Sequence, residues 1–158
     1  MKISNKLKYT FLIRYFGFVK IPLILFVRPT IYHVDDKTVV IKIPFRRRTK
    51  NHLKSMYFGA MAVGADIAAG FLAYIKIREN NLNISLIFKN FSAEFLKRAE
   101  DDTYFTCQDG IIINNLIEQA SESQERVEEH INVIATVPSK FGDESVANFK
   151  LGLSLKKR

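Results

Sequence analysis

The fold is decided by the stretch RRRTKNHLKSMYFGAMAVGADIAAGFLAY, residues 46–74, in which a basic loop leads into an apolar helix. The helix is rich in residues with little side-chain bulk, namely Gly59, Ala60, Ala62, Gly64, Ala65, Ala68, Ala69 and Gly70. A glycine costs a helix about 1 kcal/mol relative to alanine, so several glycines in one helix need a tertiary reason. Close packing against a curved sheet supplies one. The stretch therefore predicts a central helix from Met56 to about Tyr74 that lies against a sheet.

Asp66 is the single ionisable residue inside this apolar run. Burying a carboxylate costs free energy unless the group is paired or hydrogen-bonded, and such groups are frequent at functional sites. Two interpretations follow for Asp66. It is either a functional carboxylate or a structural one whose hydrogen-bonding needs are satisfied.

Length and composition favour a single domain, because 158 residues with 47% hydrophobic and 25% charged side chains suffice for one ordinary core. The one cysteine, Cys107, excludes an internal disulfide and fits a reducing, cytoplasmic compartment. We expect Cys107 to be a buried residue of a strand. His33, His52 and His130 lie far apart without paired acidic or cysteine ligands, so we predict no metal site.

Positive charge is concentrated in the first third of the chain. Residues 1–54 contain 13 Lys or Arg and two Asp, whereas residues 55–158 contain 11 Lys or Arg and 14 Asp or Glu. A basic surface favours an anionic partner, and nucleic acid, phospholipid and a phosphorylated cofactor all qualify. The sequence lacks helix-turn-helix and aromatic RNA-binding patterns, so we expect no nucleic-acid partner. It also lacks the GxSxG, Walker and GxGxxG motifs of the commoner hydrolases, NTPases and dinucleotide-binding enzymes.

Residues 1–28 predict an N-terminal helical extension. Arg14, Lys20 and Pro22 interrupt its apolar run, so we expect neither a signal peptide nor a transmembrane segment. The helical spacing predicts an apolar face that covers the core or a ligand tunnel, formed by Leu12, Tyr15, Phe16 and Val19. Attachment to an anionic lipid surface is the alternative.

The rest of the chain, residues 29–158, predicts an antiparallel sheet around the central helix, an α+β architecture. A bulge near Lys89-Asn90 explains a change of phase in one long strand. Residues 111–121 predict a second short helix or an irregular crossover, and residues 138–143 predict a loop. Alternating apolar residues predict strands at 30–34, 38–45, 82–95, 103–108, 131–137 and 147–155.

Such a helix wrapped by such a sheet resembles the hotdog fold. In hotdog acyl-CoA thioesterases of the phenylacetate-degradation type, an Asn precedes a His-Gly-Gly turn that opens the central helix, and an acidic residue follows about two turns later. Asn51, Tyr57-Phe58-Gly59 and Asp66 stand at the corresponding spacings. Tyr57 replaces the histidine, which moves the sequence toward the thioesterase-like branch that often lacks it.

This resemblance implies a homodimeric or homotetrameric thioesterase with composite sites and no cofactor other than the CoA of its substrate. The first-turn N–H groups of Phe58 and Gly59 would bind the thioester oxyanion. Asp66 would be the general base for water or the direct nucleophile, Asn51 would orient the thioester or water, and Tyr57 would donate its hydroxyl. The phosphates of CoA would be bound by Arg46, Arg47, Arg48, Lys50 and Lys54.

Each assignment has a structural alternative. For Asp66 the alternative is a carboxylate that accepts hydrogen bonds from backbone across the dimer interface. Asn51 is equally a helix-entry cap or turn residue, Tyr57 a packing residue, and the basic loop a solvated loop. Ser85 is a candidate for holding the water, with an ordinary strand serine as the alternative. Because the histidine is replaced, a hotdog protein that binds acyl-CoA, acyl carrier protein or fatty acid without hydrolysis is the second hypothesis for function.

Overall fold

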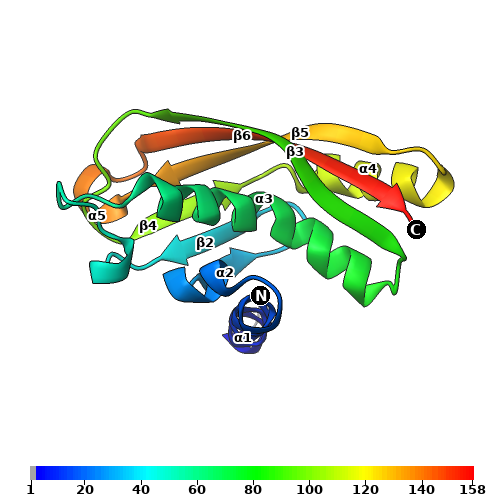
Figure 1. The fold of residues 1–158 in the computed structure, drawn as a ribbon, viewed down its shortest axis with the longest axis horizontal. Coiled ribbons are helices and arrows are strands. Elements are labelled where there is room, and N and C mark those ends of the chain that lie inside the picture. The colour runs from blue at the N-terminus through cyan, green and yellow to red at the C-terminus, as the bar shows by residue number, and fades with distance from the viewer. Residues whose placement is uncertain (1–2) are drawn as a thin grey trace.

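The computed structural model describes residues 3–158, which form one six-stranded sheet and a long helix against it (Figure 1). The helical elements are α1 Ile3–Val19, α2 Pro22–Val27, η1 Arg47–Thr49, α3 Phe58–Glu79, α4 Gly110–Glu122 and α5 Pro138–Phe141. The strands are β1 Thr30–Val34, β2 Val39–Ile43, β3 Ile84–Phe95, β4 Thr103–Cys107, β5 Val127–Thr136 and β6 Ser145–Lys157.

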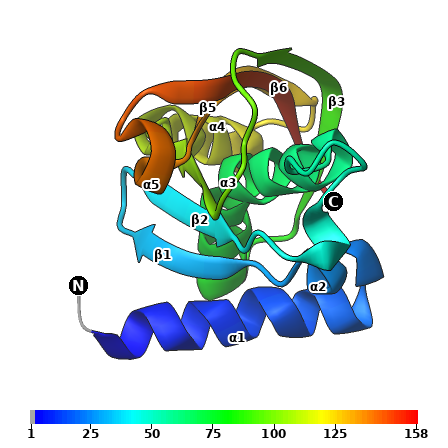
Figure 2. The ribbon, with the colours of Figure 1, turned by 90° about the vertical axis from the view of Figure 1, so that its left-hand side faces the viewer.

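The sheet has the order β1-β2-β4-β5-β6-β3, and every neighbouring pair is antiparallel. The sheet curves around α3 (Figure 2). The helix contacts the strands β2, β4, β5, β6 and β3. This arrangement is the hotdog fold, so the predicted fold class is confirmed. The strands β1 and β3 form the two edges of the sheet.

Small residues let α3 approach the sheet closely, as the sequence predicted. The ring of Phe105 on β4 lies over Gly64, where a Cβ atom would come within 2.5 Å of the ring. Ala65, Ala68 and Ala69 are fully buried beside it. Cys107 is also fully buried in β4, and burial raises the pKa of its thiol to about 11.

The central helix is longer than the sequence predicted. It ends at Glu79 rather than near Tyr74, because residues 75–79 are ordinary helix formers and Asn80 is the capping residue. The bulge of β3 lies between Phe88 and Phe91, as predicted. The predicted loop 138–143 contains the one-turn helix α5.

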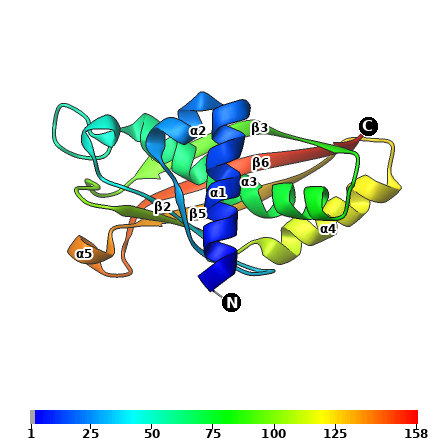
Figure 3. The same ribbon diagram turned by 90° about the horizontal axis from the view of Figure 1, so that it is seen from below.

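The N-terminal helix α1 crosses beneath α3 and forms the outermost layer on that side (Figure 3). Thr10 accepts a hydrogen bond from the N–H of Ile31, and Arg14 donates to the carbonyl oxygen of Pro29 and to the hydroxyl of Thr30. These bonds tie α1 to β1.

The inward face of α1 differs from the predicted one. Tyr9 packs edge-on against Phe71 and Phe16 packs against Tyr74, with Ile13 buried between these positions. The predicted members Tyr15 and Val19 are exposed instead. Large apolar residues occur all around α1, so their spacing did not define a single face.

Candidate functional site

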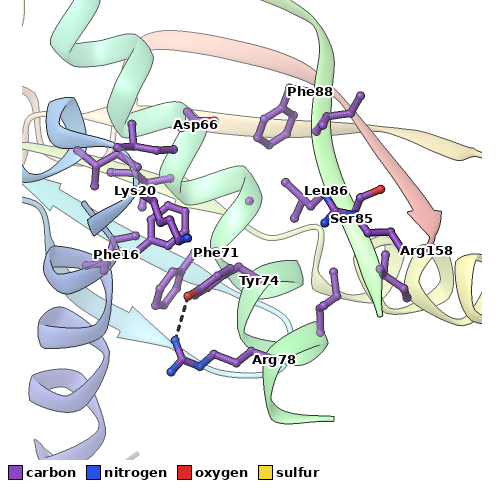
Figure 4. A pocket seen from close by; sticks show the side chains of 18 residues that line it. Phe16, Lys20, Asp66, Phe71, Tyr74, Arg78, Ser85, Leu86, Phe88 and Arg158 are labelled. Atoms are coloured by element: carbon purple, nitrogen blue, oxygen red, sulfur yellow. Dashed lines mark hydrogen bonds between the residues drawn. The ribbon is translucent and has the colours of Figure 1, made fainter. Parts of the chain in front are cut away.

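A cavity of about 650 Å³ lies between α3, the N-terminal helices and β3 (Figure 4). Its walls are mostly apolar and include Phe16 of α1, Phe71 of α3 and Phe88 of β3. Lys20 and Arg158 are exposed residues of the lining and mark where the cavity meets solvent. Pockets of this size and composition are typical of small-molecule binding sites.

Asp66 is the carboxylate of this cavity. It lies on α3 between the lining residues of the N-terminal helices and those of β3 (Figure 4). Burial raises the pKa of Asp66 from 3.8 to about 6, and within the described residues no hydrogen bond or charge opposes that effect. A carboxylate with a pKa near 6 is largely ionised at neutral pH, yet it still accepts a proton readily.

The cavity follows α3 for most of its length. Asp66, Gly70, Tyr74 and Arg78 line it at intervals of four residues, so they lie on one face of the helix. From Asp66 to Arg78 this face extends about 18 Å at 1.5 Å per residue. Arg78 donates a hydrogen bond to the Tyr74 hydroxyl at 3.1 Å, which places a polar end opposite the carboxylate. The shape suits an elongated apolar ligand.

The first turn of α3 has backbone N–H groups without a hydrogen-bond acceptor in the helix, and these groups lie far from Asp66. Among the described residues no side chain caps this helix, and its first-turn amides, including those of Phe58 and Gly59, have no acceptor within the helix. Gly59 and Asp66 are seven residues apart, about 10 Å along the axis. Within one chain, the N–H group of Gly59 and the carboxylate of Asp66 are therefore too far apart to act on the same substrate atom.

Asn51 is engaged by its own loop. Its side-chain oxygen accepts hydrogen bonds from the N–H groups of Leu53 and Ser55, and its amide nitrogen donates to the Ser55 hydroxyl at 3.0 Å. The interpretation as a turn residue accounts for these bonds. Asn51 is not part of the cavity that contains Asp66.

Tyr57 lies at the N-cap of α3 and folds back over the helix. A Cβ atom on Gly59 would come within 2.5 Å of the Tyr57 ring, so the absence of a side chain at Gly59 makes room for that ring. The ring also packs against Phe58 with a centroid separation of 4.8 Å. Both aromatic side chains are exposed, and neither lines the cavity of Asp66.

The basic loop lies before α3 and not at the cavity within one chain. Arg48 donates a hydrogen bond to the Phe26 carbonyl and lies over the Phe26 ring, while Lys50 lies over the ring of Phe45. All five cationic side chains are exposed, namely Arg46, Arg47, Arg48, Lys50 and Lys54. They occupy the same end of α3 as its free amide groups.

Most of the residues that line the cavity were not predicted from the sequence. Tyr74, Arg78, Leu86 and Phe88 line it without having been predicted there, and Ser85 lines it with its hydroxyl donated to the Lys156 carbonyl at 3.1 Å. The sequence signal for the helical part of the lining is the four-residue spacing from Asp66, which leads to Gly70, Tyr74 and Arg78. Among residues 3–158, no three His, Cys, Asp or Glu side chains are grouped so as to hold a metal ion.

The family is shown by a sequence match. A model for a domain of unknown function, DUF4442, matches residues 11–147. The chain belongs to this family. No curated protein matches this DUF4442 chain.

Solved structures resemble this DUF4442 chain over nearly its whole length. The protein OLEI01261 of unknown function from Chlorobaculum tepidum TLS has a TM-score of 0.80 at 12% identity, covering 97% of each chain. A protein from Shewanella oneidensis described as a candidate thioesterase has a TM-score of 0.76 at 11% identity, covering 96% of this chain and 99% of its own. PA5026 from Pseudomonas aeruginosa, described as a probable thioesterase, has a TM-score of 0.75 at 21% identity, covering 94% of this chain and 96% of its own. At these identities the likeness shows the fold.

One helix among the described residues, α3, is long and apolar enough to cross a membrane by length and composition. Two-thirds of the most apolar 18-residue segment of this helix is buried inside the protein. Since the sheet wraps around it, α3 is the core helix of the fold.

Proposed function

We propose that this protein is an acyl-CoA thioesterase that acts as a homodimer or homotetramer, with Asp66 as the general base. The observation that carries the proposal is the position of Asp66, a carboxylate with its pKa raised to about 6 at an elongated apolar cavity. The thioesterase descriptions of the structural neighbours, and the pattern from Asn51 to Asp66, support the same reaction class.

The reaction would run as follows. The acyl chain lies along the apolar face of α3, and its thioester carbonyl approaches the free N–H groups at the start of a second copy of α3. Asp66 takes a proton from water while the water oxygen attacks the carbonyl carbon. The amides of Phe58 and Gly59 stabilise the resulting oxyanion, a contribution typically about 100-fold to 1000-fold in rate per donor. The carbon–sulfur bond then breaks, and CoA leaves as a thiolate that takes up the proton.

A second copy of the chain is part of this proposal for two reasons. Asp66 and Gly59 are about 10 Å apart along their own helix, so oxyanion donors beside Asp66 must come from elsewhere. In addition, β3 is an edge strand of 12 residues, and its Phe91 and Phe95 contact the buried Phe149 while remaining about half exposed. A long apolar edge favours pairing with another strand. Pairing of β3 with β3 of a second copy would continue the sheet.

The substrate is proposed to be an aliphatic thioester, because Phe16, Phe71, Leu86 and Phe88 give the cavity apolar walls. The basic loop of the second copy, which accompanies its α3 amides, would bind the phosphates of CoA. Acyl carrier protein is the alternative carrier, since its phosphopantetheine presents the same thioester. We place the reaction in the cytoplasm, in keeping with a single cysteine and a CoA substrate.

A panel of acyl-CoA thioesters, with free thiol as the readout, tests the proposal. We expect turnover of aliphatic substrates by the wild type and a loss of about 100-fold or more in Asp66→Asn. Glu118→Gln, which removes an exposed carboxylate of α4, is the matched control and should retain activity. Failure to hydrolyse any chain length, or full activity of Asp66→Asn, would overturn it.

A binding protein without hydrolase activity is the second candidate. It is favoured by the contacts of Asn51, whose amide is occupied by its own loop, and by Tyr57, whose ring covers Gly59. Native mass spectrometry after incubation with acyl-CoA separates the two functions. Retention of intact acyl-CoA favours binding, whereas release of CoA favours hydrolysis.

A further inference from the structure

The outer face of α1 is an unpaired apolar stripe. Its members are exposed to 69% at Leu7, 72% at Phe11, 53% at Tyr15 and 71% at Phe18. Steps of four, four and three residues place these side chains on one side of the helix. The rings of Phe11 and Tyr15 stack on each other with a centroid separation of 6.2 Å. We call these four residues the α1 stripe.

The exposure of apolar side chains is concentrated in this part of the molecule. Of 19 large hydrophobic side chains that are exposed among the described residues, eight lie between Leu7 and Phe26. These include Leu23 and Phe26 of α2. Contiguous exposed apolar surface on this scale marks an interaction site more often than scattered single residues do.

Charge indicates which partner the α1 stripe meets. Six Lys or Arg and no Asp or Glu precede Asp35 in the sequence. Lys8, Lys20 and Arg28 are exposed, and Lys6 lies over the ring of Tyr32. Within residues 1–34 this apolar, aromatic helix face is accompanied by cations and by no carboxylate of its own segment. That is the pattern of a helix that lies in the interface of an anionic bilayer.

A second cavity of about 420 Å³ lies beside the α1 stripe, between α1 and the last turns of α3. Phe11 and Tyr15 line it together with the cations Lys8 and Arg78 and with Glu79, which accepts a hydrogen bond from Tyr9. The two cations outnumber the one carboxylate, which already accepts the hydrogen bond from Tyr9. Apolar walls with this net positive charge fit the junction of an acyl chain and an anionic headgroup.

We propose that the α1 stripe docks this protein on an anionic membrane surface, with α1 lying in the plane of the headgroups. The opposite face of the same helix supplies Ile13 and Phe16 to the wall of the main cavity. Membrane contact is thereby made by the element that separates the bilayer from the Asp66 cavity. The proposal concerns docking and stands apart from the proposed hydrolysis, although acyl chains that partition into bilayers would suit both.

Tryptophan fluorescence gives a direct test, because the chain contains no tryptophan. Phe18→Trp places a reporter on the α1 stripe, and Leu53→Trp places one at an exposed position of the loop before α3. With vesicles containing about 30% phosphatidylglycerol in phosphatidylcholine, we expect the emission of Phe18→Trp to shift to shorter wavelength and that of Leu53→Trp to remain unchanged. The shift should decrease as NaCl is raised from about 50 to about 500 mM.

Vesicle sedimentation supplies the matched comparison. Phe11→Ser combined with Phe18→Ser should weaken binding to anionic vesicles about 100-fold relative to Leu53→Ser. Because both phenylalanines are exposed, circular dichroism should confirm a retained fold. Equal binding of the two variants, or no spectral shift on anionic vesicles, would overturn the proposal.

A second copy of this chain is the other partner that could cover the α1 stripe. Gel filtration with light scattering, in the absence of lipid, tests for it. If the double serine variant changes the oligomeric state, the α1 stripe is a contact with a second copy and the membrane proposal fails. Asp66→Asn should bind vesicles as the wild type does, so this result is independent of the hydrolase assay.

Discussion

Replacing Asp66 with asparagine should stabilise the folded protein at neutral pH while it removes the proposed catalytic group. Burial raises the pKa of Asp66 from 3.8 to about 6. Between these two values the unfolded chain has lost its proton while the folded protein still holds it. The free energy of unfolding therefore falls as the pH rises through this window.

The magnitude follows from the width of that window. One pKa unit corresponds to about 1.4 kcal/mol, so the full cost of ionising Asp66 in the folded state is about 3 kcal/mol above pH 7. About 1 kcal/mol of this cost is already present at pH 4.5 by the same relation. An asparagine carries no charge at either pH. The gain in stability from Asp66→Asn should consequently be about 2 kcal/mol larger at pH 7.5 than at pH 4.5.

Urea denaturation at a fixed protein concentration measures this difference. The free energy of unfolding is determined for wild type and Asp66→Asn at both pH values. Glu118→Gln removes an exposed carboxylate of α4 and should change stability by less than about 0.5 kcal/mol at either pH. An equal effect of Asp66→Asn at the two pH values, or a destabilisation at pH 7.5, would refute the reasoning.

Three further predictions concern packing, assembly and CoA binding. Gly64→Ala should destabilise the protein by about 1–3 kcal/mol in thermal or urea unfolding, because a methyl group there meets the Phe105 ring. Phe91→Asp should convert the proposed dimer to monomers in analytical ultracentrifugation, whereas Ile111→Asp, at an exposed site on α4, should not. Arg47→Ala should raise KM about 10-fold for acyl-CoA and leave KM for the matching acyl-pantetheine unchanged. Unaltered stability, assembly or KM would count against the respective argument.

The fold could be predicted because its deciding features are local in sequence. The small residues from Gly59 to Gly70 specify a helix in close contact with a sheet, and the alternating strands identify that sheet. The contact of the Phe105 ring with Gly64 shows why a small residue is needed at that position of the helix. The end of α3 was predicted too early, because no helix-terminating residue marks it before Asn80. The buried face of α1 was predicted wrongly, because large apolar residues occur on every side of that helix.

The candidate site was harder to predict because it depends on contacts between distant segments. Asp66 stood out as a lone carboxylate in an apolar run, and burial does raise its pKa. Its neighbours Phe16 and Phe88 are 50 and 22 residues away in sequence, so only the packing of α1 and β3 against α3 brings them together. The roles predicted for Asn51 and Tyr57 stay predictions, because neither residue lines the cavity that contains Asp66. The role proposed for the basic loop requires a second copy of the chain.

The pH dependence of kcat/KM for an aliphatic acyl-CoA tests most directly whether Asp66 drives hydrolysis. The account predicts that kcat/KM rises with one ionisation near pH 6, the value to which burial raises the pKa of Asp66. The rise should disappear, together with most of the rate, in Asp66→Asn. A profile that is flat between about pH 5 and pH 8, or one that Asp66→Asn leaves unchanged, would contradict it.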